Sequence, residues 1–408
     1  MSLHVLIAGA GLGGLTLAHG LRKAGVDVTV YERDPRHDFR LQGYRIHIDA
    51  PGHTALAECL PEDLYELYIA TSTATPDKQV AMFFDHRFDK TGEGDARAGD
   101  FTPARSPTAV NRHTLRQILL TGLDGALRFG RELVGYEQTD AGVQAHFADG
   151  SVANGDVLVA ADGINSVVRH QLLPHAEICD TGVRAITGKT TMAALEADFP
   201  EELHNTFTGV HGPDYRTLAM AEYRSRRPQQ EAATELVPDA RLDPVPDYLM
   251  WLQLAPVGDL PIREQALWRT DSATLHGIAL DMLDGWHPTL RRLVERADKP
   301  STFPLSVRAV LPVNPWQTSN VTLLGDAIHA MAPIGGRGAN TALCDAASLS
   351  AKLRAADRGQ LSLYPAIAEY ESRMREQGQE AVIASLHKSG PSLGARSPYS
   401  PEQTRTAS

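Results

Sequence analysis

Apolar and polar positions over the first 34 residues predict a strand, a helix and a second strand. Residues 4–8 form a short apolar run, typical of a parallel strand that is buried on both faces. An apolar stripe at helical spacing follows over 12–24, and Gly25 suits a C-terminal helix cap. The segment 26–31 is rich in β-branched residues and leads to Glu32, so a second strand is expected there.

A block of short apolar runs follows, with the spacing of alternating strands and helices. Asn111 suits the N-cap of a helix over 112–123. Four runs predict strands: 127–129, 132–138, 143–147 and 156–161. The last run is continuously apolar, like the run at 4–8, and it leads directly to Asp162 and Gly163.

From about residue 181 the chain alternates between apolar and polar positions, which predicts an antiparallel sheet. Its clearest strands are 183–191, 217–223 and 248–254. Helices are predicted over 273–286 and 289–297. The segment 224–246 is charged, contains proline and has no regular period, so we expect it to form a surface excursion.

The chain then returns to buried strands and amphipathic helices. Strands are predicted over 301–310 and 321–324, and helices over 339–353 and 364–385. The last residues, 389–408, are rich in Ser, Pro and Gly, which predicts a flexible tail.

Composition narrows the class of protein. Hydrophobic residues make up 42% of the chain and charged residues 22%, as in ordinary globular proteins. A net charge of −11 argues against nucleic acid or an anionic membrane as the main partner. No apolar run approaches the ~20 residues that span a bilayer, and Cys59, Cys179 and Cys344 lack metal or redox spacing. We expect a cytoplasmic protein with reduced cysteines and no metal site.

A glycine fingerprint at the end of the first strand predicts a dinucleotide site. It consists of Gly9, Ala10, Gly11, Leu12, Gly13 and Gly14. The first glycine permits a sharp turn, Gly11 lets the backbone approach a pyrophosphate, and the last permits close helix–strand packing. The helix N-terminus offers its amides to phosphates. Glu32 can accept hydrogen bonds from a ribose diol, whereas the adjacent Arg33 could bind the 2′-phosphate of NADP, so the identity of the nucleotide stays open here.

Two later motifs lie at the ends of the predicted strands 156–161 and 321–324. The first reads DVLVAADGINSVVR over 156–169, and the second reads GDAIHAMAP over 325–333 and continues as GGRGAN over 335–340. Together with the fingerprint, these ordered motifs resemble the single-component FAD-dependent aromatic hydroxylases. These are the group A flavoprotein monooxygenases with the para-hydroxybenzoate hydroxylase fold. The resemblance extends over residues 1–385.

The resemblance implies FAD as the cofactor and assigns residues to it. Asp326 would hold the ribityl chain, Arg112 would support the cofactor from its helix start, and Asp162 would brace the pyrophosphate region. The turn expected beside the isoalloxazine contains Gly336, Gly338, Ala339 and Asn340. A glycine-rich turn that opens a helix aims backbone amides at the N1–C2=O edge, where negative charge develops when the flavin is reduced.

The resemblance also implies the reaction. NAD(P)H would reduce the flavin, O2 would add at C4a, and the resulting C4a-hydroperoxyflavin would hydroxylate a small aromatic or polycyclic, polyketide-like substrate. Few side-chain catalysts are then expected. The segment 42–49 alternates as a strand with Arg45 and His47 on one face. In relatives this stretch runs beside the flavin, so both are candidates for the flavin or substrate edge. A solvated or phosphate contact without a catalytic part is an equal alternative.

Several large residues of the predicted antiparallel sheet could line a substrate pocket or belong to an ordinary core: Phe207, Met220, Tyr223, Met250 and Trp251. The predicted fold class is α/β, with a Rossmann-like FAD-binding domain, an interleaved antiparallel-sheet substrate domain and C-terminal helices. We expect the FAD-binding domain over 1–75, 105–180 and 305–388, where its third part includes the C-terminal helix. The substrate domain is expected over 76–104 and 181–304.

Two other functions stay open on the sequence alone. The first is a flavin dehydrogenase, reductase or halogenase on the same scaffold, although the four tryptophans lack the Trp-x-Trp-x-x-Ile spacing of such halogenases. The second is a binding protein that uses the fold without flavin. The intact fingerprint, Glu32 and the Gly325–Asp326 pair argue against the second function.

Overall fold

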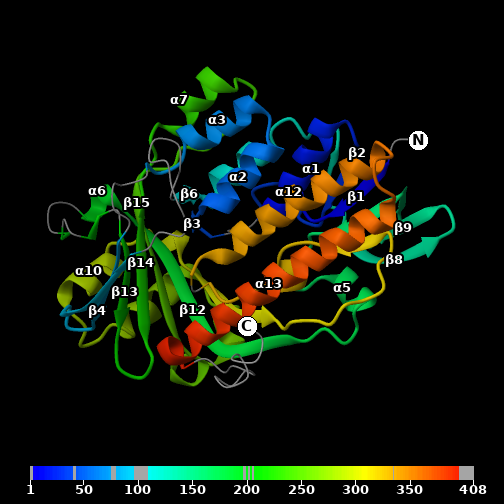
Figure 1. Cartoon of the computed structure of the whole chain (residues 1–408). Helices are drawn as coiled ribbons and strands as arrows, with labels where there is room; N and C mark the ends of the chain where they lie inside the picture. The colour runs from blue at the N-terminus through cyan, green and yellow to red at the C-terminus, as the bar shows by residue number, and fades with distance from the viewer. Residues whose placement is uncertain are drawn as a thin grey trace.

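The computed structural model describes residues 3–39, 43–74, 80–95, 109–195, 199–200, 203–204, 206–333 and 335–394. Two large sheets organise the chain, with five strands in one and seven in the other. Helices α12 (Arg337–Asp357) and α13 (Leu363–Leu393) lie side by side and run from one sheet toward the other (Figure 1). The predicted α/β fold class is confirmed.

The five-stranded sheet is parallel throughout, in the order β17-β11-β1-β2-β7. Its strands are β1 (His4–Ala8), β2 (Asp27–Glu32), β7 (Leu127–Phe129), β11 (Val157–Ala160) and β17 (Val321–Leu323). All four residues of β11 are buried, in accord with its continuous apolar run. Ala160 pairs with Ala8 on one side and with Leu323 on the other. The Gly9, Asp162 and Gly325 turns of the three motifs therefore follow these strands at adjacent points along the carboxyl end of the sheet.

Helices pack around this sheet. They are α1 (Leu12–Ala24), α2 (Ala50–Cys59), α3 (Glu62–Ala70), α4 (Arg112–Leu120), α5 (Val167–Leu172) and α11 (Asp326–His329). Gly25 caps α1 with a left-handed φ of 83°, as predicted. Asn111 caps α4 by accepting a 3.0 Å hydrogen bond from the Thr114 amide, also as predicted.

Two small antiparallel sheets complete this half of the molecule. One contains β8 (Leu133–Thr139), β9 (Gly142–Phe147) and β10 (Val152–Gly155). The other pairs β3 (Arg45–His47) with β6 (Ala109–Asn111). The strand expected over 42–49 is thus short, and its first residue lies outside the described residues.

The seven-stranded sheet has the order β16-β12-β15-β14-β13-β4-β5. Its strands are β4 (Val80–Asp85), β5 (Lys90–Asp95), β12 (Ile178–Thr191), β13 (Phe207–His211), β14 (Thr217–Tyr223), β15 (Tyr248–Pro256) and β16 (Phe303–Val310). Neighbouring strands are antiparallel, as predicted, except that β4 and β13 are parallel. Because β4 comes from an early segment, distant parts of the chain meet in this sheet.

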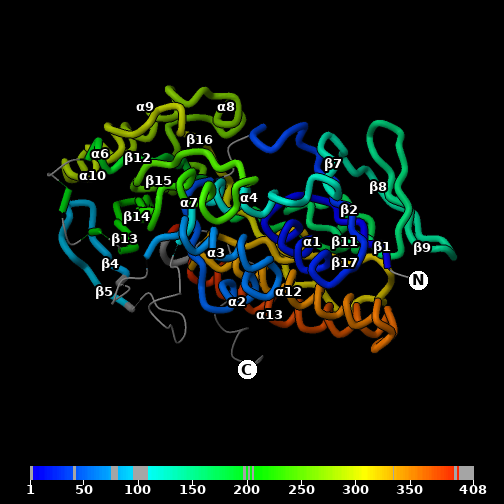
Figure 2. Tube along the Cα trace, turned by 90° about the horizontal axis from the view of Figure 1, so that it is seen from above, coloured from blue at the N-terminus to red at the C-terminus, as the bar shows by residue number. Residues whose placement is uncertain are grey.

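Helices cover the outer face of the seven-stranded sheet. They are α6 (Met192–Leu195), α8 (Glu264–Leu267), α9 (Ser272–Asp281) and α10 (Pro288–Glu295), with short 3-10 helices at Val257–Asp259 and Lys299–Ser301. Figure 2 shows α9 and α10 on the side away from the five-stranded sheet. Met220 and Trp251 pack there against Leu275 and Leu290 in one buried cluster. The opposite face of the sheet borders an interior cavity.

Two predictions at the level of elements were wrong. The segment 224–246 contains a helix, α7 (Gln229–Leu236), whose Ala232 and Ala233 are buried in the main core. Small alanines gave this segment little hydrophobic signal, although they let α7 pack against α3. Helix α13 continues to Leu393, past the expected start of the tail at 389, while residues 395–408 lie outside the described residues. None of the described helices is both long and apolar enough to cross a bilayer.

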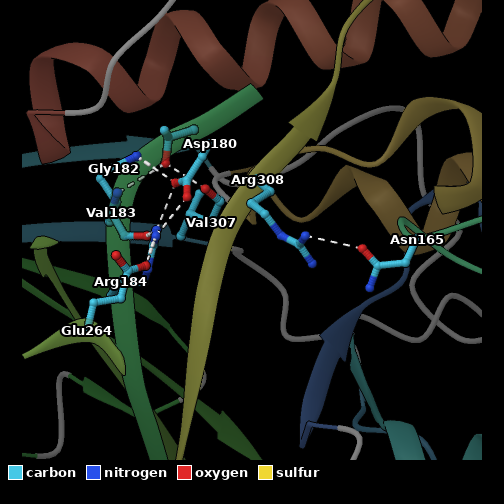
Figure 3. A network of polar contacts seen from close by, with 9 residues as sticks. Asn165, Asp180, Gly182, Val183, Arg184, Glu264, Val307 and Arg308 are labelled. Atoms are coloured by element: carbon cyan, nitrogen blue, oxygen red, sulfur yellow. Dashed lines mark hydrogen bonds and ion pairs between the residues drawn. The ribbon is translucent and has the colours of Figure 1, made fainter. Parts of the chain in front are cut away.

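A polar clamp holds the bend by which β12 enters the seven-stranded sheet. The register of β12 against β16 shifts between Asp180 and Val183, and Gly182 takes a φ of 72° there. The buried Arg184 guanidinium donates to Asp180 at 2.7 and 2.8 Å and to Glu264 (Figure 3). Arg308 of β16 donates to Asn165, which follows the Asp162 motif, at 3.2 Å. These contacts connect the bend to the loop beyond β11.

We expect Arg184→Met to destabilise the protein by about 1.5–3 kcal/mol, because charge-assisted hydrogen bonds at the bend are lost. Thermal unfolding of the variant would measure this loss. Arg227→Met is the matched control, since Arg227 pairs with Glu231 and Glu235, whose side chains are 65% and 64% exposed. Such surface pairs contribute little. Equal melting temperatures for the Arg184 variant and the wild type would contradict the clamp.

Candidate functional site

A cavity of about 1610 Å³ lies between the two large sheets. It is lined by nearly all residues that the sequence predicts for a cofactor site: Gly9, Gly11, Leu12, Gly13, Gly14, Glu32, Arg33, Arg112, Asp162, Asp326, Gly336, Gly338 and Ala339. Arg45 and His47 also line it. The cavity therefore brings together the early, middle and late motifs.

The fingerprint glycines have two different physical roles. Gly9 has a φ of 104°, and a Cβ on it would lie 2.3 Å from the Ala161 carbonyl oxygen. A Cβ on Gly14 would lie 2.2 Å from the Gly9 carbonyl oxygen. A Cβ on Gly11 would meet nothing within 4 Å, and its φ of −78° suits any residue. Gly9 and Gly14 are thus required by packing, whereas Gly11 leaves open space for a ligand beside the start of α1.

The Glu32 carboxylate is held rigidly at the end of β2. Its Oε2 accepts a 2.8 Å hydrogen bond from the Ala10 amide, and its Oε1 accepts a 2.9 Å bond from the Asp34 amide. Each carboxylate oxygen can accept more than one hydrogen bond, so capacity remains for a ribose diol. Arg33 beside it is exposed, and its proposed phosphate contact stays a prediction.

Asp162 carries an unused acceptor. Its Oδ2 accepts a 3.0 Å hydrogen bond from the Val167 amide, whereas its buried Oδ1 has no partner among the described residues. Burial raises the pKa of this carboxyl group. A ligand hydroxyl that donates to Oδ1 would satisfy the atom, which is what a sugar-bearing cofactor offers.

The late motif turns sharply because Gly325 has φ 62° and ψ −137°, a conformation that glycine alone adopts readily. One oxygen of the buried Asp345, Oδ2, accepts from the Gly325 amide at 3.0 Å and from His329 Nε2 at 2.5 Å. These two hydrogen bonds to Asp345 hold the turn in its conformation. Asp326 is left exposed to the cavity at the start of α11.

Asn340 is placed differently from the other residues of the glycine-rich turn. It does not contribute to the described cavity lining. Its Nδ2 donates to the carbonyl oxygens of His47 and Gly336 at 2.9 and 3.0 Å, and its Oδ1 accepts from the Asp49 amide at 3.0 Å. The structure thus gives Asn340 the task of joining the turn to β3, one layer behind the cavity wall.

Arg45 connects the short β3–β6 sheet to the seven-stranded sheet at the cavity. Its Nε donates a 2.8 Å hydrogen bond to the Glu222 carbonyl oxygen of β14. Burial lowers the pKa of its guanidinium to about 10, so the group stays charged at neutral pH. Arg112 lies at the same end of the short β3–β6 sheet, where its amide donates to the Tyr44 carbonyl oxygen at 2.6 Å.

Comparison with known proteins identifies the family. Residues 293–385 match an FAD binding domain, and residues 7–57 match an NAD(P)-binding Rossmann-like domain. A solved structure from Photorhabdus luminescens subsp. laumondii, assigned as an FAD-containing monooxygenase, is 34% identical to the chain. The two share a TM-score of 0.81 over 96% of this chain and 99% of that one. The chain belongs to the FAD-dependent monooxygenases.

Curated relatives that are also named FAD-dependent monooxygenases match the chain over different shares of their own length. A dual O-methyltransferase/FAD-dependent monooxygenase of Cercospora beticola is 34% identical over 93% of this chain, which spans only 45% of that protein. An FAD-dependent monooxygenase of Trichoderma harzianum is 29% identical over 94% of this chain and 92% of that protein. The predicted family and its cofactor, FAD, are confirmed. A flavin-free binding protein is correspondingly disfavoured.

The cavity of this FAD-dependent monooxygenase fits the cofactor. The unpartnered Asp162 Oδ1, the open space at Gly11 and the Glu32 carboxylate are suited to the hydroxyls and pyrophosphate of FAD. Glu32 would hold the ribose, Asp326 the ribityl chain, and the start of α12 the isoalloxazine. These residue roles stay predictions. No group of three or more described His, Cys, Asp or Glu side chains could hold a metal ion.

The other end of the cavity is walled by the inner face of the seven-stranded sheet. Of the large residues considered from sequence, Phe207 and Met250 line the cavity. Met220 and Trp251 belong to the core on the opposite face, and Tyr223 packs in a separate tyrosine cluster. Because side chains alternate between the two faces of a strand, some of these large residues line the cavity and others belong to the core.

Sequence reasoning missed several residues of this wall and its rim: Phe83, His211, Thr217, Lys388 and Leu393. The segment 207–211 reads FTGVH, and its Gly and Thr weaken the alternating signal that could have revealed β13. Of these residues, Leu393 comes from the part of α13 that was expected to be tail. A Cβ on Gly394 would lie 3.0 Å from the Tyr215 ring, so the end of this helix packs against the β13–β14 turn.

We expect Gly11→Ala to keep the stability of the apoprotein while weakening FAD binding by roughly tenfold or more, about 1.4 kcal/mol. The added methyl group meets open space in the protein but occupies room for the cofactor. Gly9→Ala, in contrast, should destabilise the apoprotein itself. Flavin titration and thermal unfolding of both apoproteins would test this difference. Similar melting temperatures for the two variants would refute the conclusion that Gly9 is required by packing and Gly11 by the cofactor.

We expect the contribution of His329 to stability to fall as the pH rises. Burial opposes the charged ring, but Asp345 offsets this and the pKa of His329 is raised above 6.5. The charged pair is therefore complete at low pH and is lost as the pH passes through the raised pKa. The difference in melting temperature between wild type and His329→Gln should shrink from mildly acidic to alkaline pH. A difference that grows with pH would contradict this sign.

Proposed function

We propose that this chain hydroxylates a flat aromatic or polycyclic small molecule, with NAD(P)H and O2 as co-substrates. The observation that carries the proposal is the continuity of one cavity. Its cofactor end contains the three motifs, and its other end is an apolar sheet face with Phe83, Phe207 and Met250. A substrate on that face would lie against the flavin-binding turn without crossing bulk water.

Bound FAD would supply the redox chemistry by accepting a hydride from NAD(P)H and activating O2 at its C4a position. The protein's own residues would bind, orient and exclude water. The amides at the start of α12 would face the flavin edge on which negative charge develops, and the positive end of the helix favours that charge. Arg45, which donates from β3 to β14, would add a fixed positive charge to the same region.

The sheet wall would protect the oxygen-transferring step from water. Leu252, Leu254 and Leu305 line it together with the aromatic residues. A water-poor surface suits a reaction in which release of hydrogen peroxide competes with transfer of oxygen to the substrate. The volume of about 1610 Å³ exceeds the ~300–1,000 Å³ of a typical single-ligand pocket, which supports occupation by both FAD and a second molecule.

The experiment is an ¹⁸O₂ incorporation assay on the FAD-loaded protein with a panel of naphthols and hydroxyanthraquinones. At least one compound should accelerate NADH or NADPH oxidation and gain one ¹⁸O atom in its product. A parallel reaction in H₂¹⁸O with ordinary O2 is the control and should give no label. A dehydrogenase or reductase would give an unlabelled product. Accelerated oxidation that yields only hydrogen peroxide with every compound would contradict the hydroxylase.

A further inference from the structure

The register of the seven-stranded sheet places one titratable side chain on the substrate wall. Phe207, Gly209 and His211 alternate along β13 and face the cavity, while the intervening residues point to the core. His211 pairs with Thr217 of β14, which also lines the cavity. Among the described residues of this sheet that line the cavity, His211 is the one that titrates near neutral pH.

A flat aromatic floor lies beside this histidine. Gly209 pairs with Phe83 of the neighbouring strand, and a Cβ on Gly209 would lie 3.1 Å from Phe83 Cδ1. The missing side chain therefore makes room for the Phe83 ring. This ring lies nearly parallel to the His211 imidazole, at 15° with centroids 6.2 Å apart. A planar substrate on Phe83 would therefore lie next to the histidine.

The imidazole has one nitrogen committed and one available. His211 Nδ1 lies 3.3 Å from Thr217 Oγ1, and within the described chain this is the only hydrogen-bond partner of the ring. We assign the Nδ1 proton to this contact, which leaves Nε2 as an acceptor. Burial lowers the pKa of His211, so the ring is neutral at physiological pH.

The charged groups around His211 do not change this assignment. Asp85, its register partner on β4, accepts from the amides of Arg87 and Asp89 and is committed to its own turn. Lys388 of α13 lines the same cavity and would favour a neutral ring. The described cavity-facing residues of the sheet itself include no Asp, Glu, Lys or Arg, so a cation that holds an anionic substrate would come from outside the sheet, as Lys388 does.

We propose that His211 Nε2 binds the ring hydroxyl of a flat hydroxyarene that lies on Phe83, and accepts its proton during oxygen transfer. This proposal rests on the proposed function, which supplies the electrophilic oxygen atom from O2. When a ring carbon bonds to that oxygen, the O–O bond of the activated oxygen would break and its electron pair would leave with the second oxygen atom. At the same time the hydroxyl oxygen donates electron density into the ring and its proton becomes acidic. The O–H bond breaks, an N–H bond forms on His211, and the O–H electron pair completes a ring carbonyl. A weakly basic neutral imidazole is sufficient for such a proton.

Binding to the oxidised holoenzyme tests the hydrogen bond without turnover. The probes are 2-naphthol and its methyl ether, 2-methoxynaphthalene, followed through the flavin absorbance. We expect wild type to prefer 2-naphthol by about three- to twelvefold, the worth of one hydrogen bond. His211→Leu should remove the preference, and His211→Gln, which can still accept, should retain it. Equal affinities in wild type, including no binding of either probe, overturn the proposal, as does a preference that survives in His211→Leu.

Turnover tests the proton transfer. With a hydroxyarene that becomes labelled by ¹⁸O₂, His211→Gln should lose roughly 10²-fold or more in the rate of product formation, the usual size of general-base catalysis. The acidic limb of the kcat/KM pH profile, with a pKa below 6.5, should disappear in the same variant. An unchanged rate and limb overturn the proton-accepting role. If no compound becomes labelled, the proposed function fails, whereas the binding preference still decides the hydrogen bond separately.

The control variant is His170→Gln, because His170 is an exposed histidine of α5 that does not line the cavity. It should match wild type in naphthol preference, product rate and pH profile. FAD content and melting temperature of all variants report whether each one folds. A loss of FAD from the His211 variants alone would identify a structural role for this residue and overturn the proposal.

Discussion

The architecture depends on the parallel register of three buried strands. Because β1, β11 and β17 run in the same direction and pair at Ala8, Ala160 and Leu323, the peptide that follows each strand emerges at one edge. Parallel strands with such register gather sequence-distant loops where no local interaction could. The close contact between Gly9 and the Ala161 carbonyl group shows how tightly two of these loops meet. FAD binding follows from this geometry.

Polar contacts and small apolar clusters, rather than one continuous core, join the seven-stranded sheet to the rest of the molecule. Arg45 reaches the Glu222 carbonyl oxygen, and Arg308 reaches Asn165. Both contacts border the cavity, so the residues that hold the two sheets in position also set the distance between cofactor and substrate wall. A small shift of the bend at Asp180 would therefore change the site as well as the stability.

Sequence reasoning succeeded where a local pattern has a single physical solution. Gly25 and Asn111 occupy the caps that their chemistry predicts, and the continuous apolar runs became buried parallel strands. It failed where tertiary contacts decide. Nothing local marks Asn340 as the link between the turn and β3, and the alanines of α7 become core residues only against α3. The place of His211 in the site can be recognised only from its neighbours across the sheet, Phe83 and Thr217.

The late position of the third motif has a consequence for biosynthesis. Gly325, Asp326 and Ala342 line the cavity, yet they follow most of the chain in order of synthesis. The ribosome must extrude the chain beyond residue 323 before β17 can insert beside β11 and complete the flavin pocket. FAD therefore cannot template the early folding of the nascent chain. It can only stabilise a sheet that has already been assembled from segments far apart in the sequence.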